Sequence, residues 1–185
     1  MLKHLGIFSL VFLMACSQQA VRDIRPEIDF AEKDLGRGRA VFLDVIESAE
    51  SSASRQLVAQ SIVDENFSLP LLLKREVRAA LYNFGFTTGH DVAESDIELQ
   101  VELVDLTHIV TDNKVLASLF LRNEIRLILK KTGIVHTFTY ATQRTEKFPL
   151  APSVQASRDE VSLIIADTLR RAFKDPAFLD ELSAE

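Results

Sequence analysis

Apolar and polar residues alternate in several segments of the chain, which is the pattern of β-strands with one buried face. The first such segment covers residues 40–46, where Val41, Leu43 and Val45 share one parity. A second begins near residue 95. Its apolar positions change parity at Val104 and Leu106, which predicts a β-bulge at that point.

Two more alternating segments follow, at residues 115–129 and 134–145. The first has a long apolar face with one polar interruption, Asn123. Turn-forming residues separate the segments, at 111–114 and 131–133. Because tight turns connect antiparallel neighbours, the pattern predicts a three-stranded antiparallel meander.

A helical period begins after Ser68, a residue type that caps helix N-termini, with Pro70 in the first turn. We expect Gly85 to end this helix by adopting a positive φ. The apolar stripe between these two points consists of Leu73, Val77, Ala80, Leu81 and Phe84.

Three basic residues of this helix, Lys74, Arg75 and Arg78, fall outside its apolar stripe. We expect them to form a solvated helix face, and the alternative is contact with an anionic surface. A second helix is predicted over residues 157–173, opened by a capping box at 157–160. Asp175 and Pro176 close it and start a final short turn of helix.

The order strand, helix, three strands, helix is typical of an α+β fold. We therefore expect an antiparallel-rich four-stranded sheet with two helices packed on one of its faces. Residues 47–54 read as an exposed loop, and residues 57–67 as a small hairpin or irregular packing. The order of strands in the sheet stays open.

Ahead of this domain, residues 1–15 have the anatomy of an export signal, with Lys3 near the start and Ala15 at the cleavage point. The apolar run between them is about half as long as a transmembrane helix requires, so it does not predict a permanent span. We interpret residues 16–39 as a lipidated cysteine and tether, with a flexible joint at 36–38, and residues 40–185 as a single domain.

Residues 13–17, Leu-Met-Ala-Cys-Ser, resemble the signal of bacterial lipoproteins. The resemblance implies that Cys16 carries a diacylglyceryl group and an acyl chain such as palmitate after the signal is removed. The alternative is an unmodified cysteine beside an ordinary signal peptide. In lipoproteins an aspartate after the cysteine disfavours the outer membrane, so Ser17 implies the periplasmic face of an outer membrane in a diderm bacterium.

Composition supports a folded domain, because 47% of residues are hydrophobic. The formal net charge of −6 argues against a nucleic-acid partner. Cys16 is the only cysteine in the sequence. With its thiol lipidated, the domain has neither an internal disulfide nor a cysteine-based metal site.

No catalytic motif is recognisable in the sequence. His90, His108 and His136 lack the spacing of metal ligands. Glu98 and Glu102 fall on one strand face, where a carboxylate pair could form, but a solvated sheet face accounts for them better. We therefore expect a non-enzymatic protein without cofactor or metal.

The leading hypothesis is a lipid-anchored module that binds an envelope protein through its open sheet face or an edge strand. Aromatic and arginine residues are enriched at the centres of protein contacts. The candidate contact residues are Phe120, Arg122, Glu124 and Arg126, with Phe138 and Tyr140 on the neighbouring strand. Ordinary cross-strand pairs would explain the same residues. A second hypothesis is a carrier or sensor that holds a lipid-like or cell-wall-derived ligand between sheet and helices.

The chain resembles the YajG-type family of bacterial lipoproteins over nearly its whole length. The resemblance rests on Cys16, the leader at residues 25–28, the strand at 41–46, the helix before Gly85, the meander, and the start of the last helix at 155–157. The family's Asp-x-Arg motif after the first strand is missing here, where residues 50–52 are Glu-Ser-Ser. The resemblance implies an outer-membrane lipoprotein with the α+β fold of small accessory subunits of envelope assemblies.

Overall fold

The computed structural model describes residues 34–48, 68–112 and 116–184. The predicted signal peptide, Cys16 and most of the predicted tether lie outside the described residues. So do most of the loop at 47–67 and part of the turn at 111–114.

Five strands form one mixed sheet in the order β2-β1-β3-β4-β5. The strands are β1 (Ala40–Glu47), β2 (Thr87–Gly89), β3 (Ile97–Asp112), β4 (Ala117–Lys131) and β5 (Ile134–Phe148). β3, β4 and β5 form the predicted antiparallel meander, whereas β1 pairs in parallel with both β2 and β3. The α+β class is confirmed, but the four-stranded sheet was wrong by one strand. β2 has only three residues, too few for alternation to reveal it.

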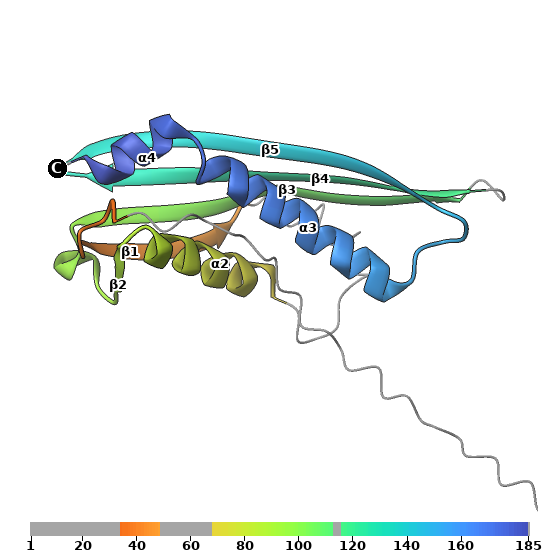
Figure 1. Cartoon of the computed structure of the whole chain (residues 1–185), viewed down its shortest axis with the longest axis horizontal. Helices are drawn as coiled ribbons and strands as arrows, with labels where there is room; N and C mark the ends of the chain where they lie inside the picture. Colours follow the sequence, from red (N-terminus) through yellow and green to blue (C-terminus); the bar gives the residue numbers. More distant parts are fainter. Residues whose placement is uncertain (1–33, 49–67, 113–115, 185) are drawn as a thin grey trace, which may run out of the picture.

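Three α-helices accompany the sheet: α2 (Leu69–Asn83), α3 (Val154–Ala172) and α4 (Pro176–Ser183). A single 3-10 turn, η1 (Val92–Glu94), connects β2 to β3. α2 packs against β1 and β2, and α3 packs against β4 and β5, so both predicted helices cover one face of the sheet (Figure 1). The predicted final turn of helix is α4, which begins after its N-cap Asp175.

The ends of α2 agree with the sequence prediction. Ser68 is the N-cap, and its side chain accepts a hydrogen bond from the Leu71 amide. Gly85 follows the helix with a φ of +79°. α3 begins earlier than predicted, because Ser153 caps it by accepting from the Ala156 amide at 3.1 Å. The predicted capping box at Ser157 is wrong, since Ser157 lies buried inside the helix.

The meander contains the predicted bulge and the predicted tight turn. The register between β3 and β4 shifts between Leu103 and Asp105. Thr132 and Gly133 connect β4 to β5 with φ values of 45° and 81°. Two positive φ angles in a two-residue loop are the geometry of a type I′ hairpin, whose twist matches that of the strands.

Alternate residues of each long strand face the helices and form one apolar core. From β4 these are Leu119, Leu121, Ile125, Leu127 and Leu129, all with no exposed surface. The core continues into α3 through Ile164 and Ile165. Among the described residues, no helix is long and apolar enough to cross a membrane.

The glycines at 36–38 are not a flexible joint. Gly36 donates to the Phe84 carbonyl, and Gly38 donates to the Gly85 carbonyl, both at 2.8 Å. A Cβ on Gly36 would lie 2.5 Å from the Gly85 oxygen, so the two chain segments are in direct backbone contact. This turn is therefore part of the folded domain.

Arg39 ties the same region to the end of the chain. Its guanidinium donates to the carbonyls of Ser183 and Ala184, each at 2.7 Å. It also lies 5.5 Å from the ring centroid of Phe86, within the range of a cation–π contact.

Candidate functional site

The six candidate contact residues do not form one surface. Tyr140 pairs with Ile125 and Phe138 with Leu127 across the β4–β5 ladder. Directly paired residues share a face of the sheet, so Phe138 and Tyr140 lie on the helix-covered face. The ring of Phe138 meets Phe178 of α4 edge-on, with centroids 5.5 Å apart. The other four candidates lie on the opposite, open face.

On the open face, the charged candidates are paired with one another and with β3. Arg126 Nη1 donates to Glu102 at 2.7 Å, and Arg122 Nη2 donates to Glu124 at 2.7 Å. Lys130 Nζ binds Glu98 at 2.7 Å, and the pair Gln100–Ile128 separates this ion pair from that of Arg126 on the same face. Glu98 and Glu102 therefore meet basic residues and not one another. The contacts of Arg126 and Lys130 agree with the alternative of ordinary cross-strand pairs, whereas Arg122 and Glu124 pair along one strand.

Phe120 lies near the far end of the open face, between Ile109 of β3 and Thr145 of β5 in the ladder. Phe120 is half-buried, and Ile109 is exposed. The structure thus brings an aromatic and an aliphatic side chain together beside Arg122.

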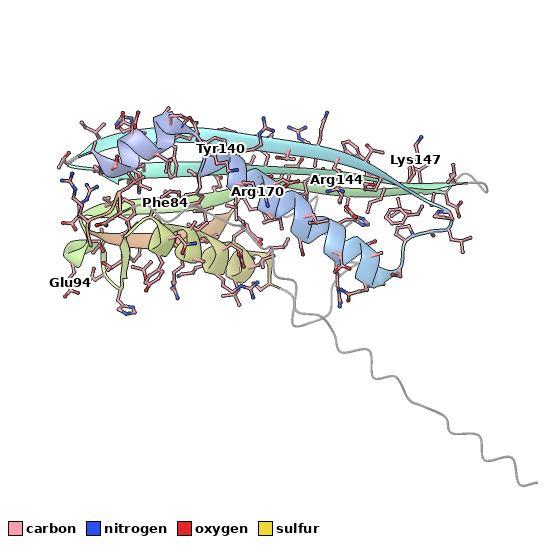
Figure 2. All side chains as sticks on the ribbon, viewed as in Figure 1. Phe84, Glu94, Tyr140, Arg144, Lys147 and Arg170 are labelled. Atoms are coloured by element: carbon pink, nitrogen blue, oxygen red, sulfur yellow. The ribbon has the colours of Figure 1, made fainter. Side chains whose placement is uncertain are left out.

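The hydroxyl of Tyr140 donates to Asp175 Oδ2 at 2.7 Å. Burial raises the pKa of Tyr140, and the bonded Asp175 carboxylate raises it further. Figure 2 shows Tyr140 and Arg144 on β5 where the strand passes α3. Tyr140 therefore has a structural partner and is not exposed for a contact with another protein.

Four polar residues between the sheet and α3 have buried atoms without a hydrogen-bond partner in the described structure. They are His108, Asn123, Thr142 and Glu160. Asn123 is fully buried with both amide atoms unpaired, and it sits opposite Thr142 in the ladder. The signal for this cluster in the sequence was the polar interruption at Asn123.

Charge in the cluster is limited by burial. Burial lowers the pKa of His108, which favours its neutral form. Burial also raises the pKa of Glu160, opposed by Arg144, whose Nε lies 3.4 Å from Glu160 Oε2. The cluster therefore combines a histidine whose neutral form is favoured with a carboxyl group that lies beside Arg144.

The histidines do not assemble into a metal site. His108 pairs with Leu121 and His136 with Leu129, so eight β4 residues, or about 27 Å, separate their ladder positions. His90 is exposed in the segment after β2. Among the described residues, no group of three histidine, cysteine, aspartate or glutamate side chains is placed to hold a metal ion.

β5 forms an edge of the sheet along 15 residues, a position that depends on strand order and not on the residue pattern of the strand. Arg171 Nη1 donates to the Ala141 carbonyl at 2.7 Å, which shows that this carbonyl is directed away from β4. Backbone groups alternate in direction along an antiparallel strand, so the odd-numbered residues of β5 share this outward direction. Apart from the Arg171 contact, no described residue outside β4 bonds to the β5 backbone.

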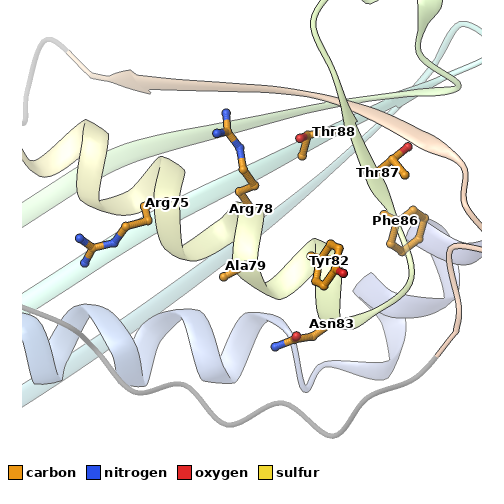
Figure 3. A pocket seen from close by; sticks show the side chains of 8 residues that line it. All are labelled: Arg75, Arg78, Ala79, Tyr82, Asn83, Phe86, Thr87 and Thr88. Carbon is orange, nitrogen blue, oxygen red and sulfur yellow. The ribbon is translucent and has the colours of Figure 1, made fainter.

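A groove of about 460 Å³ lies between α2 and the start of β2 (Figure 3). From α2 it is lined by Arg75, Arg78, Ala79, Tyr82 and Asn83, and from the following segment by Phe86, Thr87 and Thr88. Of these lining residues, the sequence pattern had singled out only Arg75 and Arg78, as part of a basic helix face outside the apolar stripe.

No protein-family model matches the chain, and no curated protein matches it. Among solved structures, the chain is similar to a Xanthomonas campestris protein of the DUF330 family, with 9% identity, a TM-score of 0.53, and coverage of 84% of this chain and 92% of that one. This likeness shows a shared fold.

Two further solved structures match over most of their length with lower scores. A putative neuraminyllactose-binding hemagglutinin homolog from Helicobacter pylori has 10% identity and a TM-score of 0.48, covering 87% of this chain and 98% of that one. The lipoprotein GNA1162 from Neisseria meningitidis has 9% identity and a TM-score of 0.37, covering 72% of this chain and 96% of that one. The three structures described are bacterial proteins, and one of them is a lipoprotein.

Proposed function

We propose that this protein is a lipid-anchored, non-enzymatic envelope protein that binds a protein partner through the free edge of β5. The observation that carries the proposal is the 15-residue edge strand, whose outward backbone groups are almost all without a partner in the described structure. An exposed edge is a template for an added strand, and main-chain hydrogen bonds then supply affinity.

In this proposal, lipid chains on Cys16 anchor the protein to the periplasmic face of an outer membrane. Its support is the lipoprotein-like signal at residues 13–17, with serine and not aspartate at position 17. Membership of the YajG-type family belongs to the same proposal. The shared fold with a bacterial protein is compatible with it.

The β5 edge is a more favourable partner-binding surface than the open face, because the open-face charges are already paired. On the open face, Arg126 and Lys130 already have carboxylate partners at 2.7 Å. A partner protein would have to replace these pairs. The side chains at the β5 positions whose backbone groups point outward also lie on the open face, along its border, and five of them are uncharged: Thr137, Thr139, Ala141, Gln143 and Thr145.

Arg171 limits access to this edge. Its bond to the Ala141 carbonyl occupies the centre of the strand, and charged groups on an edge limit unselective pairing. A partner strand must displace Arg171 from this carbonyl. Replacing Arg171 by Gln is therefore expected to increase partner capture.

Site-specific crosslinking in cells tests the contact. A photoreactive phenylalanine analogue is placed at Gln143 on the edge, and at Gln100 in the middle of the open face as the matched control. We expect a crosslinked product from position 143 and none from position 100. Products from position 100 alone would overturn the edge contact, and a product with the mass of two chains would identify the partner as a second copy.

A proline substitution on the edge strand provides a second test of the contact. The Thr139 amide points away from β4, so Thr139→Pro removes an outward donor without removing a ladder bond. We expect the variant to lose the crosslink at position 143, whereas Thr139→Val keeps it. If Thr139→Pro does not fold, Thr139→Lys tests the same point by adding an edge charge.

The lipid anchor has its own test. Cys16→Ala in the full chain is expected to move the protein from the membrane pellet to the soluble fraction, because the acyl chains supply attachment. Retention of the variant in the pellet would show that the anchor is elsewhere.

The buried polar cluster favours a second candidate function, a carrier or sensor of a small ligand. Unpaired amide atoms of Asn123 and the hydroxyl of Thr142 are suited to a polar, cell-wall-derived sugar and not to an acyl chain. Thermal shift of the full chain with soluble peptidoglycan fragments tests this function. Stabilisation that Asn123→Leu abolishes would support it, and no shift would remove it.

A further inference from the structure

The outer face of α2 carries a row of exposed side chains. Leu71, Arg75, Arg78 and Tyr82 follow one another at spacings of four, three and four residues, which places them on one side of the helix. Leu71 is 69% exposed and Tyr82 is 78% exposed, so both ends of the row present a large apolar group to solvent. We call these four residues the α2 stripe.

The α2 stripe is basic, although the chain has a net charge of −6. Lys74 lies beside it and adds a third positive charge. Glu76 is the acidic residue of this helix, and its largely buried carboxylate binds Arg75 Nε at 2.8 Å. Lys74 and Arg78 have no ion pair with any described residue, so both charges are open to an anionic group.

The groove between α2 and β2 borders the α2 stripe. In Figure 3, Tyr82 and Phe86 lie towards one end of the groove, and Arg75 and Arg78 extend from the preceding helical turns. Ala79 and Phe86 give it an apolar wall, and Thr88 contributes a hydroxyl. Basic groups therefore stand next to an apolar hollow, which is the arrangement that an amphiphilic anion requires.

We infer that the α2 stripe and its groove are a contact site for an anionic phospholipid surface. Lys74 and Arg78 meet headgroup phosphates, while Leu71 and Tyr82 enter the interface, where leucine and tyrosine are favoured on surface-lying helices. From Leu71 to Tyr82 the stripe rises by eleven residue steps, or about 16 Å, along one line, so it matches a flat surface better than a protein pocket.

The inference rests on the proposed lipid anchor, which would hold the domain near a leaflet. Residues 17–33 between Cys16 and the described domain are at most about 60 Å long when fully extended. The domain therefore stays within reach of the surface to which it is attached. The contact by α2 would set which side of the domain faces the leaflet, and leave β5 for a partner.

Lipid-headgroup quenching tests the contact in the full, lipidated protein. A fluorophore is attached through Leu71→Cys, since the native thiol of Cys16 is consumed by lipid, and vesicles contain nitroxide-labelled headgroups. We expect quenching at position 71 in vesicles with phosphatidylglycerol, and little in pure phosphatidylcholine or at raised salt. The control position is Gln143→Cys on β5, where no quenching is expected.

Charge variants supply the second readout. Lys74→Gln and Arg78→Gln should each weaken the contact about fivefold, the usual effect of one basic residue near an anionic surface. Lys147→Gln, which removes an exposed charge on β5, is the matched control and should leave quenching unchanged.

The outcomes separate this inference from the proposed function. Protein that floats with both kinds of vesicle, but shows no quenching at position 71, would overturn the contact by α2 and leave the anchor intact. Protein that floats with neither kind would overturn the anchor itself. Equal quenching in both lipids would show that charge does not select the surface.

Discussion

Tyr140 and Asp175 join the edge strand to the start of the last helix. The tyrosine hydroxyl donates to Asp175 Oδ2 at 2.7 Å, while Asp175 Oδ1 accepts from the Ala177 amide at 3.0 Å. One carboxylate thus caps α4 and holds it against β5. Phe178 follows in α4 and packs on Phe138 of the same strand.

Tyr140→Phe is expected to lower the free energy of unfolding by about 1 kcal/mol, because it removes a hydrogen bond to a partly exposed carboxylate. Urea denaturation of the two proteins measures the difference. Tyr82 is the other tyrosine of the chain and is largely exposed, so Tyr82→Phe should have no effect. Equal losses in both variants would contradict a specific role for the bond.

The same pair predicts a loss of stability in alkali. The folded state raises the pKa of Tyr140, so it binds the phenolic proton more tightly than the unfolded chain does. The free energy of unfolding should therefore be constant below the unfolded pKa of about 10 and fall as the pH rises above it. Tyr140→Phe should flatten this decline. A decline of the same slope in the variant would assign it to other groups.

Asn123→Leu is expected to stabilise the protein by about 1–3 kcal/mol, because it replaces two unpaired buried polar atoms with an apolar group of similar size. Thermal and chemical denaturation measure the gain. Leu121→Ala on the same strand face provides the contrast, since it removes apolar contacts and should destabilise. A large loss in Asn123→Leu would mean that Asn123 has a bound partner in solution.

Gly36→Ala is expected to cost at least about 3 kcal/mol, because its Cβ would lie 2.5 Å from the Gly85 oxygen and force two backbone segments apart. Gly38→Ala is the matched control. Gly38 has a φ of +79° but no neighbouring atom within 4 Å, so only the left-handed conformation opposes the change, at about 1–2 kcal/mol. Equal costs at the two positions would contradict the close packing of this turn.

Charge reversal in the open-face ion pairs distinguishes their effect on stability from an effect on partner binding. A double-mutant cycle with Arg126→Glu and Glu102→Arg should show a coupling of about 0.2–1 kcal/mol, as expected for a partly exposed cross-strand pair. In cells, Arg122→Glu with Arg126→Glu should leave the crosslinks at the β5 edge unchanged. Loss of those crosslinks in a folded variant would return the contact to the open face.

Much of the fold was predictable because local patterns are strong where one face of an element is buried. The alternation in β3, β4 and β5 marked the meander, and the parity change near Val104 marked the bulge between Leu103 and Asp105. The helix start at Ser68 and the start of α4 after Asp175 follow from side chains that bond to nearby amides. Such contacts depend on residues only two or three positions apart.

The sequence predictions were wrong where contacts between distant segments determine the local structure. β2 is a strand only because Thr87–Gly89 lies beside β1, and the glycines at 36–38 are fixed only because Gly85 lies against them. The sequence predicted one surface for Phe138, Tyr140 and Arg122. Alternation within a strand does not show which of its two faces matches a given face of the neighbouring strand. The register Ile125 to Tyr140 places them on the other face.

By itself, the sequence determined the α+β class, the antiparallel meander and the basic character of the α2 outer face, since each depends on spacing along one segment. Only the tertiary structure decided which strands form the edges of the sheet, which charges are already paired, and which polar groups are buried without a partner. Those properties depend on strand order, register and helix packing. They arise from contacts between segments far apart in the chain, which no local pattern encodes.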